Sequence, residues 1–163
     1  MFGWVRRRRK ARVQRRRAQE EKRNAATAFP KEVASHFQRL ADEFGLSFQL
    51  DPVAPVEVSL TFPRQPGLQR DIWVCLQNDD ELWFTVDRFT YCAFPYPEVW
   101  PTYETLLKGI IRGTCMVQHH GRTSYLMSLE GTEWKRVAVD WTLSRRSGSF
   151  RNDPKARADG MAV

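Results

Sequence analysis

Residues 71–94 read DIWVCLQNDDELWFTVDRFTYCAF and carry the clearest strand pattern in the chain. Residues 71–77 are nearly all apolar, which is typical of a central strand. Asn78, Asp79 and Asp80 favour a turn. Residues 81–94 then return to strand-forming side chains and predict one long strand or two shorter ones. A chain that reverses through so short a turn pairs with itself in antiparallel fashion, so we expect a largely antiparallel sheet.

The residues before this stretch predict one more strand and a helix. Residues 56–62 alternate between apolar and polar side chains, which indicates a half-buried strand. Between Phe29 and Phe44 the apolar residues recur at steps of three and four, which predicts an amphipathic helix. Gly45 is a suitable residue to end that helix.

The residues that follow predict a second helix and a set of short strands. Prolines at 95, 97 and 101 interrupt the strand pattern, and a broad apolar stripe then predicts a helix over 100–112. We expect three further strands at 114–119, 123–129 and 134–143. Turns are expected at His120-Gly121 and at residues 130–132.

These elements predict an α+β fold with a largely antiparallel sheet of about five to six strands and two amphipathic helices on one face. The expected organisation has three parts. Residues 1–27 form a basic arm that is helical or disordered, residues 28–143 form a single α+β domain, and residues 144–163 form a disordered tail.

Charge is divided unevenly along the chain. Residues 1–24 hold eleven Lys and Arg against two acids, a net charge of +9, whereas the other 139 residues have a net charge of −2. A basic segment appended to a nearly neutral domain predicts docking to a polyanion. The residues predicted to bind the anion are Arg6, Arg7, Arg8, Arg9, Lys10, Arg12, Arg15, Arg16 and Arg17.

Two anionic partners fit this arm. Nucleic acid is slightly favoured, because clustered guanidinium groups bind phosphates through paired hydrogen bonds. The alternative is an anionic membrane surface, since Phe2 and Trp4 precede the basic run and tryptophan is at home at the headgroup level. We expect no transmembrane span, because no apolar run approaches the required length of roughly 18 residues.

The sequence contains no recognisable catalytic motif. The His119–His120 pair marks the best place for an enzymatic site, but adjacent strand residues point to opposite faces, so the pair alone chelates a metal poorly. No glycine-rich phosphate-binding loop is present, so no cofactor is expected. Three widely spaced cysteines without a CxxC motif suit a reducing cytoplasm. We therefore expect a cytoplasmic, non-enzymatic accessory protein whose body binds another protein or a small ligand. A small enzyme acting near His119 and His120 is the alternative.

Overall fold

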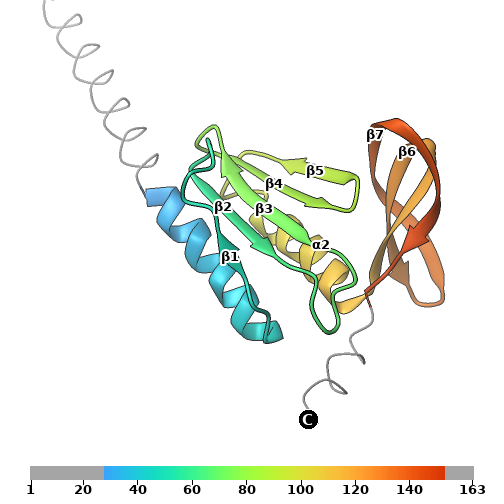
Figure 1. Cartoon of the computed structure of the whole chain (residues 1–163), viewed down its shortest axis with the longest axis horizontal. Coiled ribbons are helices and arrows are strands. Elements are labelled where there is room, and N and C mark those ends of the chain that lie inside the picture. The colour runs from blue at the N-terminus through green and yellow to red at the C-terminus, as the bar shows by residue number, and fades with distance from the viewer. Residues whose placement is uncertain (1–27, 153–163) are drawn as a thin grey trace, which may run out of the picture.

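The computed structural model describes residues 28–152, and for residues 141–150 it describes the backbone only (Figure 1). Five strands form an antiparallel sheet in which each strand pairs with its neighbours in sequence. They are β1 (Gln49–Leu50), β2 (Val58–Phe62), β3 (Ile72–Gln77), β4 (Glu81–Val86) and β5 (Phe89–Ala93). The stretch 71–94 therefore forms β3, β4 and β5 at the centre and one edge of the sheet, and its last part forms two strands rather than one.

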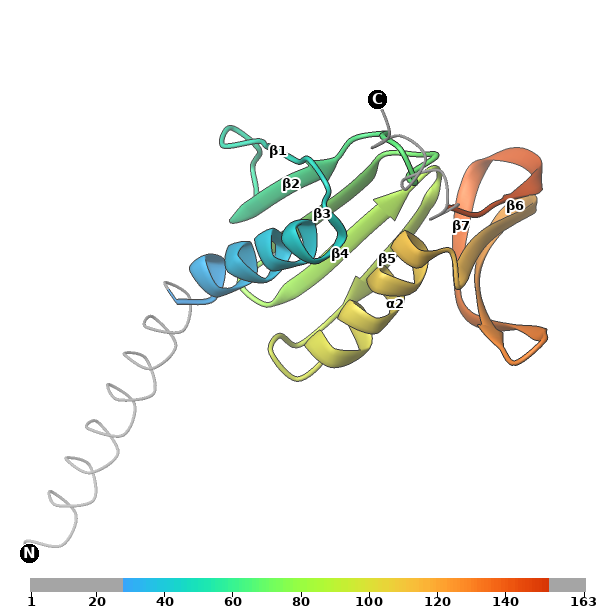
Figure 2. The same ribbon diagram turned by 90° about the horizontal axis from the view of Figure 1, so that it is seen from below.

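Two helices cover the same face of this sheet, one at residues 28–44 and the other, α2, at Trp100–Arg112 (Figure 2). The alternating pattern of the strands explains this arrangement, because every second side chain points toward the helices. Leu60, Val74 and Phe84 are register partners on adjacent strands, and all three are completely buried.

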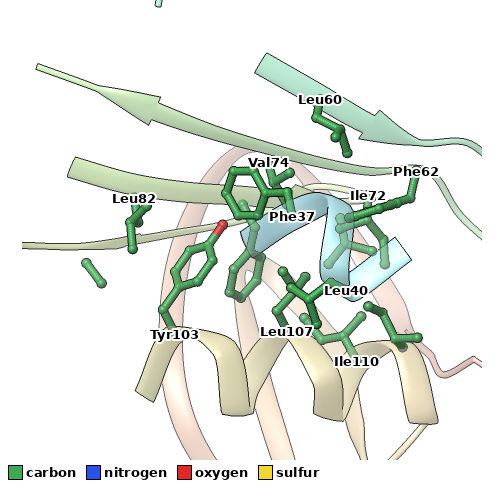
Figure 3. Packing of buried hydrophobic residues seen from close by; sticks show 14 of the residues in the cluster. Phe37, Leu40, Leu60, Phe62, Ile72, Val74, Leu82, Tyr103, Leu107 and Ile110 are labelled. Carbon is green, nitrogen blue, oxygen red and sulfur yellow. The ribbon is translucent and has the colours of Figure 1, made fainter. Parts of the chain in front are cut away.

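The core fills the space between the strands and the helices (Figure 3). Phe37 and Leu40 enter it from the first helix, and Leu107 enters from α2. Tyr103 is also fully buried, and its hydroxyl donates a hydrogen bond of 2.7 Å to the carbonyl of Trp83. A charged cluster ties the two helices together at the surface, where Glu43 accepts from both Lys108 and Arg112. The α+β class, the antiparallel sheet and the two helices on one face are thus confirmed.

The last third of the chain differs from the prediction. Two long strands, β6 (Cys115–Glu130) and β7 (Glu133–Phe150), form a separate two-stranded sheet beside β5 and the end of α2 (Figure 1). The expected turn at His120-Gly121 is wrong, because β6 runs through it with a shift of register between Gly121 and Thr123. The glycine signal there falls at an interruption in the pairing with β7, where the partner changes from Arg146 to Trp141, while the turn at residues 130–132 is confirmed.

Strand β7 continues to Phe150, seven residues beyond the expected domain end at 143. Its pairing with β6 uses backbone groups, so Ser, Gly and Arg can occupy the strand although they suggest a tail by composition. The buried side chain of Asn152 then donates to the carbonyl of Ile110 and accepts from the amide of Gln69. This contact fixes the end of β7 to the end of α2, where a tail was expected from residue 144. Residues 1–27 and 153–163 lie outside the described part of the chain.

Candidate functional site

The predicted anion-binding residues of the arm, together with Phe2 and Trp4, all lie outside the described residues. The described chain begins at residue 28, in the helix that precedes the sheet. Two places on the body combine polar chemistry with a defined geometry: the surroundings of His119 and the face of the sheet that carries no helix.

His119 lies at the centre of a short hydrogen-bonded chain. Its Nε2 is 2.8 Å from Oδ2 of Asp87, and its Nδ1 is 2.7 Å from Oγ of Ser124. Because a carboxylate can only accept, Nε2 carries the proton, and in the neutral ring Nδ1 accepts the proton of Ser124. The sequence placed His119 near a site but gave no signal for its partners, since Asp87 lies in the turn between β4 and β5.

Serine, histidine and aspartate in such a chain resemble the parts of a nucleophilic site. A nucleophile must also reach a substrate, and the residue Ser124 is only 1% exposed. The neighbouring His120 is not part of the chain of hydrogen bonds. The geometry is that of a buried polar link between β6 and the β4–β5 turn.

A second polar contact supports this interpretation. The backbone amide of Thr90 on β5 donates to Oδ2 of Asp140 on β7 over 2.8 Å. Together with the His119–Asp87 pair it fastens the two-stranded sheet to the edge of the five-stranded one.

The helix-free face of the five-stranded sheet presents three parallel rows of side chains. The row beside the β3–β4 turn contains Glu57, Gln77 and Glu81. The middle row contains Ser59, Cys75, Trp83 and Cys92. The third row contains Thr61, Trp73, Thr85 and Thr90. We call these three rows the open face; two residues along a strand separate neighbouring rows, about 7 Å.

Hydrogen bonds hold the indole rings of the open face in place. Nε1 of Trp73 donates to Oγ of Ser59 over 2.9 Å, and Nε1 of Trp83 donates to Oε2 of Glu81 over 3.2 Å. Both tryptophans remain partly exposed. The sequence pattern assigned such rings mainly to the core, although strict alternation from Glu81 to Val86 could have placed Trp83 opposite Leu82 and Phe84.

The thiols of the open face are poor nucleophiles. Burial raises the pKa of the Cys75 thiol to about 12, and burial also raises the pKa of Cys92. Since the thiolate is the reactive form of cysteine, both groups are protonated and inert near neutral pH. Neither of these two thiols therefore supplies a reactive nucleophile to the open face near neutral pH.

All the charged side chains of the open face are negative. Strands β2 to β5 contain no Lys, Arg or His. The two carboxylates of the first row, Glu57 and Glu81, form no ion pair within residues 28–152. They accept hydrogen bonds from the β3–β4 turn instead, from the amide of Asp79 and the side chain of Asn78.

A groove of about 310 Å³ lies along the edge of the sheet. Pro30, Lys31 and Ala34 of the first helix form one wall, and residues 50–52 and 56–59 form the other. Leu50 is 55% exposed at its rim, and Ser59 and Glu57 connect the groove to the open face. The groove thus joins residues 30–34 of the first helix to the acidic row.

The remaining histidine on the helices belongs to the packing between them. His36 stacks on Trp100 with ring centroids 4.2 Å apart and is hydrogen-bonded to Arg39. Burial, with the nearby Arg39 charge, lowers the pKa of His36. His36 and His119 therefore lie in separate surroundings and do not form a common site.

Within residues 28–152 no three His, Cys, Asp or Glu side chains come together as metal ligands, and no helix there has the length and apolarity to cross a membrane. Comparison with protein-family models, with curated proteins and with solved structures finds no match to this chain.

Proposed function

We propose that this chain is a cytoplasmic, non-enzymatic binding protein whose basic arm docks to a polyanion and whose α+β body binds a protein partner. The observation that carries the proposal is the division of charge, +9 over residues 1–24 against −2 over the rest. A domain with that balance gains its attraction to anions almost entirely from the arm.

Nucleic acid is the favoured polyanion. Eleven basic residues outnumber the two aromatic residues that precede them, and arginine forks match phosphate oxygens. The body supports a separate role in protein binding, because the open face is partly exposed and lacks basic residues. Phosphates would meet Glu57 and Glu81 there, so the body and the arm suit different partners.

An anionic membrane surface is the alternative partner of the arm. Trp4 and Phe2 could enter the headgroup region while the arginines remain among the lipid phosphates. The apolar stripe is short and Arg9 interrupts it, so such binding would be weak and sensitive to salt.

The test compares the full chain with an arm-neutral variant, in which the nine predicted anion-binding residues are replaced by Gln. Both proteins are titrated with a labelled RNA or DNA duplex and with vesicles of fixed anionic lipid content. We expect duplex binding by the full chain and its loss in the arm-neutral variant. A matched control replaces three body residues, Arg122, Lys135 and Arg136, by Gln and should keep the affinity.

Two results would redirect the proposal. Binding to vesicles that Trp4→Ala weakens beyond any change in charge would favour the membrane surface. Equal behaviour of the full chain and the arm-neutral variant on every target would contradict polyanion docking altogether.

A small enzyme is the second candidate, and the Ser124–His119–Asp87 chain is the observation that favours it. Burial of Ser124 opposes it, since an acyl-transfer nucleophile needs access to its substrate. A panel of activated esters decides the matter: turnover that Ser124→Ala abolishes would establish the enzyme, and we expect no turnover above that of the variant.

A further inference from the structure

The open face lies on the side of the sheet opposite both helices (Figure 2). Each row has accessible side chains, since Trp73, Gln77, Trp83 and Thr85 are all partly exposed. Ser59 and Cys75 of the middle row are buried beneath them. Two indole rings held by hydrogen bonds are already ordered, so a partner that contacts them loses little additional side-chain entropy on binding. Partly exposed aromatic rings that are held in place by hydrogen bonds are typical of a surface that binds a partner.

Charge decides which partner suits the surface. The Glu57 and Glu81 carboxylates flank Gln77 on adjacent strands, about 10 Å apart by strand spacing, with Trp83 one row away. A cation placed over this corner would meet two carboxylates and one aromatic ring. No cation of the described residues occupies the corner, since neither carboxylate has an ion pair there.

Arginine fits the corner better than lysine does. The planar guanidinium group can stack on an indole ring and still direct its N–H groups to carboxylates, whereas an ammonium group offers no planar face. The rest of the open face offers the partly exposed Thr61, Thr85 and Thr90, which suit the polar backbone and small side chains of an extended peptide.

Other occupants suit the surface less well. A nucleic-acid strand would stack on the tryptophans but bring its phosphates against the carboxylates. An apolar helix or a second copy of the face would need a wide hydrophobic area, and here the two indoles stand among hydroxyl, amide and carboxylate groups.

We propose that the open face binds an arginine-bearing peptide segment of a protein partner, with the guanidinium group at the corner formed by Trp83, Glu57 and Glu81. This inference rests on the proposed function, because it names the chemistry of the partner that the body binds.

The probe is a capped synthetic peptide of nine residues, with one arginine among Ser, Thr and Ala, and a matched peptide with Gln in place of that arginine. Titration of the full-length protein should show binding of the first peptide and at least about tenfold weaker binding of the second. The indole N–H resonances of Trp73 and Trp83 should shift in the nuclear magnetic resonance spectrum.

Variants locate the site. Glu57→Gln combined with Glu81→Gln should weaken the arginine peptide about tenfold while keeping the hydrogen bonds that Glu81 accepts. Trp83→Phe should weaken it less, since a smaller ring remains. Glu133→Gln removes one negative charge from an exposed residue away from the open face, and it should leave the affinity unchanged. Equal affinities for the two peptides, or an unchanged affinity in the double variant, would overturn the proposal.

The same experiment identifies competition from the chain itself. If the arm-neutral variant bound the arginine peptide about tenfold more tightly than the full chain, the occupant would be the chain's own arm, and the assignment to a partner would be wrong. Duplex binding is measured on the same variants. Loss of peptide binding in the double variant with duplex binding intact separates failure of this inference from failure of the arm proposal.

Discussion

Gly45 and Gly113 each follow a helix in the left-handed backbone region, with φ of +58° and +73°. They differ in their surroundings: a Cβ at Gly45 would meet nothing within 4 Å, whereas one at Gly113 would lie 2.1 Å from the backbone oxygen of Asn152. The pair therefore separates the cost of an unusual φ from the cost of a close contact.

We expect Gly45→Ala to lower the free energy of unfolding by about 1 kcal/mol, which is the conformational cost alone. Gly113→Ala should cost about 3 kcal/mol, because Asn152 must move and lose its hydrogen bonds to Ile110 and Gln69. Chemical denaturation measures both. Equal losses of unfolding free energy in the two variants would contradict the close contact between Gly113 and Asn152.

The polar link at His119 makes a second prediction at this scale. Ser124→Ala removes the hydroxyl that faces Nδ1 of His119 and leaves this partly buried ring nitrogen without its partner, so the free energy of unfolding should fall by about 1–2 kcal/mol. The matched control is Ser35→Ala, at an exposed helix position where the serine bonds only to the carbonyl of Lys31. The control should leave stability unchanged or raise it slightly, and a similar loss in both variants would contradict a specific role for Ser124.

Between elements, the ionic cluster of the two helices predicts a dependence on pH. The hydrogen bond from Lys108, with help from Arg112, lowers the pKa of Glu43. A carboxyl whose pKa is lowered by folding stabilises the protein above its ordinary pKa, and this contribution disappears as the pH falls through the lowered value.

Glu43→Gln should therefore lower the free energy of unfolding at pH 7 by about 0.5 kcal/mol, a small effect because the side chain is 39% exposed. The difference from the wild type should shrink below about pH 4. Urea titrations at several pH values measure it, with Asp42→Asn as a neighbouring acid that forms no ion pair in residues 28–152. A difference that grows on acidification would contradict the role given to Glu43.

Elements with strong periodicity were predictable from the sequence, and those set by distant contacts were not. The alternation at residues 56–62 and the helical spacing from Phe29 to Phe44 report the burial of one face, which is a local property. The length of β6 depends instead on its pairing with β7, and the glycine at 121 suggests a turn until the partner strand is known.

The partner residues of the candidate sites could not be predicted either, because they also depend on contacts between distant parts of the chain. Asp87 and His119 are 32 residues apart and meet only because the two sheets lie side by side. The open face could not be predicted for another reason. The sequence pattern shows that Trp83 and Leu82 point to opposite sides of the sheet, but it does not show which side the helices cover.

Over the whole molecule, the residues that determine the fold and the residues that carry the excess positive charge lie in different parts of the chain. The core that determines the fold lies within residues 28–152, and the excess of positive charge lies before it. Changes to the arm should therefore alter binding to anions without altering the stability of the body. Replacement of Glu57 and Glu81 by Gln on the open face should alter neither the binding to anions nor the stability of the body.

The most direct test of the central claim is the salt dependence of duplex binding by the full chain and by the arm-neutral variant. Each phosphate neutralised by the arm releases counterions, so contact with about six phosphates predicts a slope near −5 for log K against log salt concentration. The account predicts this slope for the full chain and a slope within about one unit of zero for the arm-neutral variant. A shallow slope for the full chain, or the same steep slope for both proteins, would contradict it.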